Sequence, residues 1–256
     1  MLDWLTRWRE RRIIAASTLD EATWTRTFAA LPLLDRLTPA ERTRLGELAI
    51  LFMHEKDIQG LGELQLTDAM RLSIALQACL PVLHLGLGWY DDWVSVLVYP
   101  DEFLVSHSWE DEDGVVHQGQ GPLSGEAWDR GPVILSWSDV CAAGDDGYNL
   151  VIHEFAHKLD MRNGGANGFP PLHRDMQPNA WSGAFSAAYR DFTAREEAGE
   201  ELPFDDYASE SPAEFFAVAS EVFFEAPAHL HDCYPAVYRQ LALFYRQDPA
   251  ATWIGC

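Results

Sequence analysis

Two histidines four positions apart carry the clearest chemical signal in this chain, in the stretch His153-Glu154-Phe155-Ala156-His157. Residues at this spacing lie on one side of an α-helix about one turn apart, so both imidazoles can reach a single metal ion. The carboxylate of Glu154 can then reach a water molecule bound to that ion. The spacing therefore predicts a zinc-dependent hydrolase in which His153 and His157 bind the metal and Glu154 is the general base.

The residues around this motif predict a short helix that is buried on most of its surface. Gly144 and Gly147 interrupt the chain before it, and Asn163-Gly164-Gly165 ends it, because Asn and Gly suit a left-handed helix cap. The apolar residues of the helix are Leu150, Val151, Ile152, Phe155, Ala156 and Leu159. The alternative is a pair of core histidines, each hydrogen-bonded to a carbonyl, but an unpaired Glu154 in that core would carry a large desolvation cost.

A second predicted helix, over residues 212–225, supplies the third ligand that a catalytic zinc site needs. Ser211 suits its N-cap and Pro212 its first turn. Glu214 and Glu221 are seven residues apart and share an otherwise apolar face, where carboxylates need a cation or hydrogen-bond donors. We assign Glu214 as the zinc ligand and Glu221 as a residue that supports the ligands. The alternative for Glu214 is a solvated carboxylate favoured by the helix dipole.

Several stretches besides the motif make the chain recognisable. They are His153 to Asp160 with Arg162-Asn163-Gly164, Tyr207 to Ala217, Ser220-Glu221 with Phe223-Phe224, Leu80 to Leu87, Val96 to Pro100, Trp109-Glu110-Asp111 and Phe244 to Pro249. With these stretches the chain resembles the bacterial Mlc titration factor A family of zinc peptidases, from about residue 30 to 250. The stretch from Tyr207 is also similar to the ligand helix of the anthrax lethal factor protease domain.

The resemblance implies a site and an activity. His153, His157 and Glu214 would bind one zinc ion, Glu154 would be the general base and Tyr207 would be an active-site tyrosine. The family is described as cytoplasmic, aminopeptidase-like peptidases that also bind the repressor Mlc, which links them to expression of the glucose phosphotransferase system. The implied fold is a zincin-like α+β domain, mostly helical, with a small mixed sheet beside the active-site helix. An edge strand of such a sheet can take up an extended peptide as a further strand.

These residues support a peptidase mechanism of the gluzincin type. Tyr207 could donate its phenolic hydrogen to the oxyanion of the transition state, although without the resemblance it reads as an ordinary half-buried tyrosine. Histidine ligands usually donate their other ring N–H to a neighbouring acceptor, and Asn149, Asp160 and Glu221 are the candidates. Each of these could instead be a helix-surface residue. The alternative functions are a weakly catalytic or non-catalytic regulatory binding protein on a zincin scaffold and a purely structural domain.

The composition restricts the class of partner. The chain has 256 residues, of which 48% are hydrophobic, and a net charge of −22 from 40 acidic and 18 basic residues. A chain this acidic lacks the basic stripe that nucleic acids require, and the sequence has no apolar run of membrane-spanning length. We therefore expect a peptide or protein substrate and no nucleic acid or membrane. Isolated cysteines and the lack of an apolar signal core predict a cytoplasmic protein.

The simplest division of the chain is an N-terminal extension, residues 1–30, and a single catalytic domain, residues 31–256. Trp4 and Trp8 stand beside arginines and could contact a partner or a membrane surface, or belong to a short helix folded onto the domain or to a mobile end. The elements expected elsewhere are helices from Thr38 to Met53 and from Thr67 to Cys79, strands at Val94–Tyr99, Pro132–Trp137 and Val115–His117 (an edge strand), and helices near 178–196 and 235–247.

Overall fold

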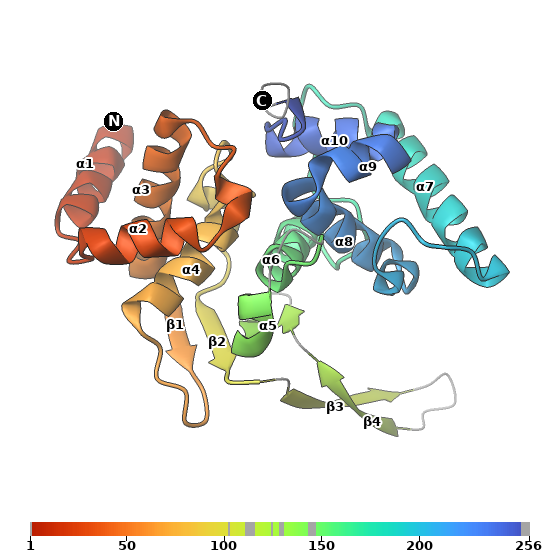
Figure 1. The fold of residues 1–256 in the computed structure, drawn as a ribbon, viewed down its shortest axis with the longest axis horizontal. Helices are drawn as coiled ribbons and strands as arrows, with labels where there is room; N and C mark the ends of the chain where they lie inside the picture. The colour runs from red at the N-terminus through yellow and green to blue at the C-terminus, as the bar shows by residue number, and fades with distance from the viewer. Residues whose placement is uncertain are drawn as a thin grey trace.

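The structure, a computed structural model, describes residues 2–101, 103–110, 116–123, 125–127, 131–142 and 147–251. Helices dominate it, and α6 (Leu150–Asp160) lies in the middle of the molecule. The N-terminal helices and strands lie on one side of α6 and the C-terminal helices on the other (Figure 1). Among the described residues, no helix combines the length and the apolar composition that spanning a bilayer requires.

The N-terminal half is a set of helices whose starts follow from capping residues. They are α1 (Leu2–Ala15), α2 (Glu21–Ala29), α3 (Pro39–Glu55) and α4 (Asp68–Cys79). At the start of α3, the Thr38 hydroxyl accepts a hydrogen bond from the Glu41 N–H, and the Glu41 carboxylate accepts one from the Thr38 N–H. This capping box confirms the predicted helix start. The second predicted helix is confirmed as α4, with Thr67 as its N-cap.

A small mixed sheet lies beside α6. Its strands are β1 (Asp57–Gly60), β2 (Ser95–Tyr99), β6 (Val133–Ser136) and β5 (Gly125–Ala127), in that order. Strands β1 and β2 lie below α4 in the N-terminal half (Figure 1). The first three are parallel, and β5 pairs antiparallel with β6 at the edge. Alternate residues of β2, Val96 and Val98, are fully buried, as expected for a strand with one face on the core. Helix α6 packs against β5 and β6, so the predicted mixed sheet beside the motif helix is confirmed.

A second, antiparallel pair of strands lies apart from this sheet. It consists of β3 (Phe103–Glu110) and β4 (Val116–Leu123), which pair from Phe103 with Leu123 to Glu110 with Val116. The strand predicted at Val115–His117 falls on β4, although Val115 lies outside the described residues. It pairs with β3, the preceding strand, and not with the main sheet; β3 itself was not expected.

The C-terminal half is helical and packs against α6 through α8. Its helices are α7 (Pro178–Ala198), α8 (Pro212–Glu225), α9 (Pro227–Cys233) and α10 (Pro235–Tyr245). The short helix η3 (Met161–Asn163) precedes α7, and η4 (Asp206–Ser209) lies between α7 and α8. The three predicted helices in this region are confirmed, and α9 and the six-residue α5 (Trp137–Ala142) were not expected. Aromatic rings pack α7, α8 and α10 together, with Trp181 5.9 Å from Phe216 and 5.6 Å from Phe244 between ring centroids.

Every residue of α6 is buried, which positions the metal-ligand motif at the junction of the two halves. Helix α8 packs along one side of α6, α4 along another and the sheet along a third. Lys158 is part of this burial: its ammonium group donates a hydrogen bond to the Gly131 carbonyl at 2.9 Å, just before β6. Helices α1 and α2 pack on α3 and α4, and the division into residues 1–30 and 31–256 stays a prediction.

Candidate metal centre

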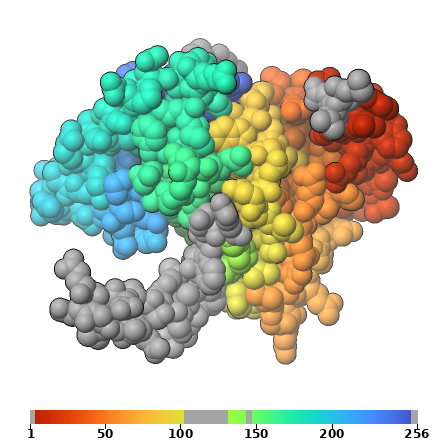
Figure 2. Space-filling view, turned by 180° about the vertical axis from the view of Figure 1, so that it is seen from behind, coloured from red at the N-terminus to blue at the C-terminus, as the bar shows by residue number. Residues whose placement is uncertain are grey.

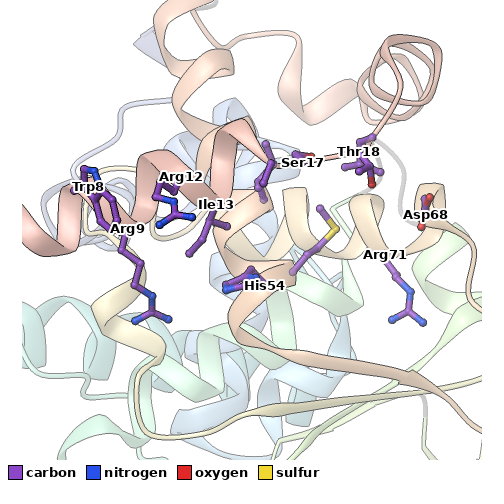
Figure 3. Close-up of a pocket in the computed structure, with 13 residues that line it drawn as sticks. Trp8, Arg9, Arg12, Ile13, Ser17, Thr18, His54, Asp68 and Arg71 are labelled. Carbon is purple, nitrogen blue, oxygen red and sulfur yellow. The ribbon is translucent and has the colours of Figure 1, made fainter.

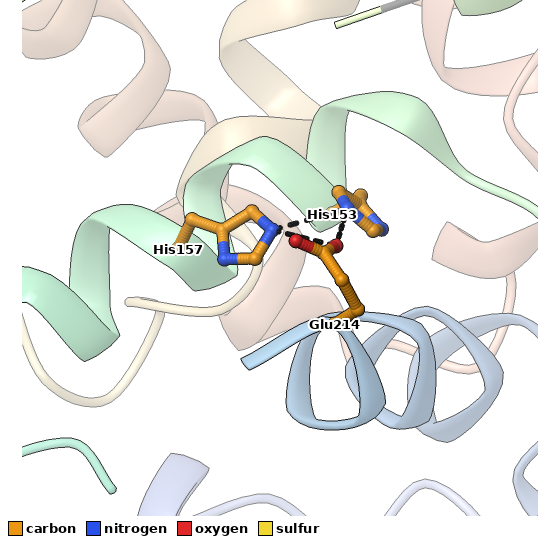
Figure 4. Close-up of side chains that lie close together, drawn as sticks. All are labelled: His153, His157 and Glu214. Carbon is orange, nitrogen blue, oxygen red and sulfur yellow. Dashed lines mark hydrogen bonds and ion pairs between the residues drawn. The ribbon is translucent and has the colours of Figure 1, made fainter. Parts of the chain in front are cut away.

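Three side-chain atoms from two helices converge at one point. Nε2 of His153 and Nε2 of His157 lie 3.2 Å apart, and Oε2 of Glu214 lies 3.0 Å from the first and 3.1 Å from the second (Figure 4). The two histidines come from successive turns of α6, and Glu214 comes from the first turn of α8. Within the described part of the chain, these residues form the group of His, Cys, Asp and Glu side chains that could hold a metal ion.

This triangle has the size and chemistry of a metal site. Four ligands about 2.1 Å from a zinc ion in a tetrahedron are about 3.4 Å apart, close to the three separations found here. When the His153 ring is neutral, its Nδ1 donates to the Glu221 carboxylate and its Nε2 presents a lone pair to Oε2 of Glu214. Lone pairs facing one another in a buried position need a cation between them. Without a metal ion, a proton on the histidine takes the place of the cation. The residues present therefore fit a divalent metal with two nitrogen ligands and one oxygen ligand.

The start of α8 places Glu214. The Ser211 hydroxyl accepts a hydrogen bond from the Glu214 N–H at 3.2 Å, and Pro212 occupies the first turn. Burial alone would raise the pKa of the Glu214 carboxyl, but the hydrogen bonds from His153 and His157 outweigh it and lower the pKa to about 2. Glu214 is therefore ionised throughout the physiological range, as a metal ligand must be.

Glu221 lies two turns after Glu214 on α8 and binds the ring nitrogen of His153 that faces away from Glu214. Its Oε1 accepts from Nδ1 of His153 at 2.7 Å, and its Oε2 accepts from the backbone N–H of Asn149 at 2.6 Å. Burial disfavours a charge on His153, yet the Glu221 and Glu214 carboxylates raise its pKa well above the ordinary value. A proton and a metal ion therefore compete for His153.

Asn149 extends this network beyond the residues that the sequence suggested. Its Oδ1 caps α6 by accepting a hydrogen bond from the Ile152 N–H, and its own backbone N–H donates to Glu221. Asn149 therefore does not accept from a histidine ring, contrary to the prediction from the sequence. Its Nδ2 donates to Gln77 Oε1 at 2.8 Å and to Glu225 Oε1 at 2.7 Å. Gln77 and Glu225 were not identified from the sequence as part of the site. One signal was present: Gln77 stands among apolar residues of a helix, and a buried amide needs hydrogen-bond partners.

Asp160 joins α6 to α8 at the opposite end, through a loop. Its Oδ2 accepts from the backbone N–H groups of Asn167 and Gly168, both at 2.7 Å, and not from a histidine. The Gly168 carbonyl in turn accepts from the Trp181 indole N–H at 3.0 Å. Gly168 has φ +75° and lies against the Pro212 carbonyl, so that a Cβ on it would come within 2.4 Å of that oxygen. The loop is thus wedged between the end of α6 and the first turn of α8, two residues before Glu214.

Glu154 lies beside the metal triangle with only 4% of its surface exposed. Its Oε2 is buried and has no hydrogen-bond partner among the described residues. Burial raises the pKa of Glu154 to about 7, with the two histidines opposing the shift. A carboxylate with a pKa near neutrality can both take up and release a proton at physiological pH.

Tyr207 lies in η4, next to the triangle. Its ring centroid is 5.9 Å from that of His153, and 41% of its surface is exposed. Burial of its inner part, together with the Glu214, Glu210 and Glu154 carboxylates, raises the pKa of Tyr207 above its ordinary value. The phenol therefore keeps its proton and can act as a hydrogen-bond donor at the mouth of the site.

Comparison with known proteins gives this geometry a family. The chain matches the glucose-regulated metallo-peptidase M90 family over residues 5–246. It belongs to that family. Mlc titration factor A of Edwardsiella ictaluri is 46% identical to the chain over 227 residues, covering 86% of the chain and 85% of the relative. The protein of the same name from Yersinia pestis is 43% identical over 226 residues, covering 86% and 83%. The resemblance to the Mlc titration factor A family is thereby confirmed.

The M90 match covers both halves of the molecule. It includes α6 and α8, which carry the metal triangle, and most of α1. A family of metallopeptidases requires a metal site, and His153, His157 and Glu214 form a group that could hold the ion in this chain.

Substitution of Gly168 tests the contact between the loop and α8. In Gly168→Ala, the new Cβ would clash with the Pro212 carbonyl, and an alanine at φ +75° is strained. We expect a loss of about 2 kcal/mol in unfolding free energy and a roughly tenfold lower metal affinity. Chemical denaturation and chelator competition measure the two. The matched control is Gly165→Ala, where a Cβ meets nothing within 4 Å. Equal behaviour of the two variants would show that the contact does not position Glu214.

The pKa of Glu154 predicts a pH-dependent stability in the metal-free protein. The carboxyl ionises at about 7 when folded and near its ordinary 4.5 when unfolded, a difference equivalent to about 3 kcal/mol. The folded state is therefore not penalised below pH 4.5 and loses stability as the pH rises towards 7. We expect Glu154→Gln to become progressively more stable than the parent over this interval. Urea denaturation in chelator across pH 4.5 to 8 measures it, and a difference that does not vary with pH contradicts the assignment.

Proposed function

We propose that the chain is a zinc-dependent peptidase of the glutamate-zincin type, with a zincin-like fold and an aminopeptidase-like preference. The observation that carries the proposal is the convergence of Nε2 of His153, Nε2 of His157 and Oε2 of Glu214 beside the buried Glu154. Two imidazoles and one carboxylate are a usual ligand set of catalytic zinc in peptidases, with the fourth position open. We accordingly assign one zinc ion per chain.

Zinc held by His153, His157 and Glu214 would lower the pKa of a bound water molecule and polarise the scissile carbonyl. Glu154 accepts the proton of the attacking water and passes it to the leaving amine, two transfers that suit a pKa of about 7. Tyr207 donates its phenolic hydrogen to the oxygen that becomes negative, an interaction that strengthens as the charge develops. Glu221 keeps the proton of His153 on Nδ1 and so leaves Nε2 free as a ligand.

The charges around Tyr207 support the aminopeptidase-like preference. Glu210, Glu214 and Glu154 all act on the tyrosine, and Asp205 caps the helix that carries it. A negative potential beside the reacting carbonyl favours a substrate with a free, positively charged α-amino group. Peptides with acetylated N-termini should therefore be poorer substrates than the same peptides with free N-termini.

Removal of the general base tests the mechanism. We expect Glu154→Gln to keep its zinc and to lose hydrolysis of peptide substrates by about 10²- to 10⁴-fold, because the proton acceptor is gone. The measurements are peptide cleavage by mass spectrometry and metal content by atomic emission. The matched control is Glu197→Gln, an exposed carboxylate on α7 that belongs neither to the ligand triangle nor to the charges around Tyr207. Undiminished cleavage by the zinc-loaded Glu154→Gln protein would overturn the proposed role of Glu154.

A second proposal concerns a regulatory partner. We propose that the chain binds the repressor Mlc and influences expression of the glucose phosphotransferase system, on the basis of the name shared by its relatives. Such binding is compatible with a weakly catalytic protein. We also propose a cytoplasmic location, which the free cysteines Cys79, Cys141 and Cys233 support.

Calorimetric titration with purified Mlc separates the two roles. If the repressor is a partner and not a substrate, the parent and Glu154→Gln should bind it with the same affinity, and Mlc should remain intact. Absence of binding by both proteins rejects the partner proposal without affecting the peptidase. Cleavage of Mlc by the parent alone would make the repressor a substrate.

A further inference from the structure

Helix α1 is a basic element in a strongly acidic chain. Its arginines Arg7, Arg9, Arg11 and Arg12 stand within six residues, whereas the whole chain carries 18 basic and 40 acidic residues. Arg9 and Arg12 have no carboxylate within ion-pair distance among the described residues. By contrast, Arg42, Arg162 and Arg195 elsewhere on the surface each have an aspartate partner. The positive charges of Arg9 and Arg12 are therefore available to an anionic group from outside.

The same helix exposes large apolar side chains. Trp4, Leu5 and Trp8 are 59%, 48% and 48% exposed. Trp8 follows Leu5 by three residues and Trp4 by four, so the three side chains form one stripe along the helix. Three of the six strongly exposed large apolar side chains among the described residues lie on this helix, and the other three are scattered over the surface. A clustered apolar stripe beside unpaired arginines is typical of a contact surface.

A groove of about 560 Å³ continues this stripe between α1, α3 and α4 (Figure 3). Its apolar lining includes Ile13 of α1, Ile50 and Met53 of α3, and Leu19 of the segment between α1 and α2. Arg9, Arg12, Arg71 and His54 add basic groups, and Asp68 is the acidic residue among those that line it. The volume is large enough for one or two bulky side chains of a bound chain.

Two contacts hold the groove in shape before any ligand arrives. The Arg12 guanidinium lies over the Trp8 ring, 4.8 Å from its centroid, which orients both side chains. The Arg71 guanidinium donates a hydrogen bond to the Ile58 carbonyl at the end of α4 nearest β1. Because these groups are already placed, a ligand would meet a smaller entropic cost on binding.

The groove is remote from the metal centre. Helix α1 lies at one end of the molecule, and α7 and α8 lie towards the other (Figures 1 and 2). No residue that lines the groove belongs to the metal triangle or its network. A ligand bound there would leave the access to Glu154 and Tyr207 open.

We propose that the groove and stripe of α1 form a docking site for an acidic peptide segment of a partner protein, with bulky apolar residues among its carboxylates. Carboxylates would pair with Arg9 and Arg12, and apolar side chains would cover Trp8 and enter the groove. The stripe and groove from Trp4 to Ala16 extend about 18 Å along the helix axis, which suits a peptide better than a single metabolite. Nucleic acids and anionic bilayers are extended arrays of charge and would meet the repulsion of a chain of net charge −22. At physiological ionic strength, salt screens charges beyond about 8 Å, so a short peptide bound at α1 experiences little repulsion from the acidic residues elsewhere on the surface.

Fluorescence anisotropy with a synthetic peptide tests the site on the intact protein. The probe is about twelve residues long, has blocked ends and combines glutamates with leucine and phenylalanine. We expect binding that weakens with added salt and falls at least about tenfold in Arg9→Glu/Arg12→Glu. The control is Arg26→Glu/Arg239→Glu, which changes the net charge equally at exposed arginines outside the groove. It should bind within about twofold of the parent.

Further variants make each outcome decisive. Trp8→Ala should also weaken binding, and Trp8→Phe should restore part of it, while circular dichroism and metal content stay unchanged. Loss of binding in His153→Ala but not in Arg9→Glu/Arg12→Glu would place the peptide in the metal centre and overturn the proposal. Absence of binding by the parent, equal weakening by the control pair, or α1-dependent binding to phosphatidylglycerol vesicles without peptide binding would overturn it as well. None of these results depends on whether the chain hydrolyses peptides.

Discussion

The carboxylate of Glu221 joins the two helices that carry the metal ligands. It is 2% exposed, and a charge buried to that degree is stable only when donors surround it. Its two oxygens accept from the His153 ring and from the Asn149 backbone, so one side chain fixes both the tautomer of a ligand and the alignment of α6 with α8. With that alignment set, Glu214, two turns nearer the start of α8, faces the Nε2 atoms of both histidines.

The other end of the same pair of helices is closed by backbone groups. Asp160 receives two N–H donors from the loop, and Gly168 brings that loop against Pro212. The metal triangle therefore lies between two contacts that join α6 to α8. One is made by the buried Glu221 carboxylate and the other by the close approach of Gly168 to Pro212. Ligands on helices held at both ends keep their separations with little freedom, which favours a preformed metal site. The acidic groups inside this centre and the basic helix α1 far from it divide the chemistry of the molecule into two regions.

Local sequence was sufficient for the elements whose signals are local. The capping box at Thr38 and Glu41, the Ser211-Pro212 start of α8 and the apolar, β-branched runs of β2 and β6 were all predicted and found. The pairing of β4 with β3 was not, because no strand was predicted over residues 103–110, where Ser106, His107 and Ser108 interrupt the apolar run. Asp160 illustrates a further limit: its position on α6 suggested a partner for a histidine, whereas the fold presents it with the N–H groups of Asn167 and Gly168.

By itself, the sequence determined that His153, Glu154 and His157 share one region of a helix, because helical geometry alone brings residues four apart together. It also identified Glu214 and Glu221 as carboxylates on an apolar face that would need a cation or donors. The sequence also assigned Glu214 as the ligand and Glu221 as the supporting residue, but only the tertiary structure shows the contacts, Glu214 with the histidine Nε2 atoms and Glu221 with Nδ1 of His153, because they depend on how α6 and α8 are aligned. The hydrogen bonds of Asn149 to Gln77 and Glu225, and the groove between α1, α3 and α4, also appear only in the tertiary structure. Packing between distant segments sets those contacts, and no local pattern encodes them.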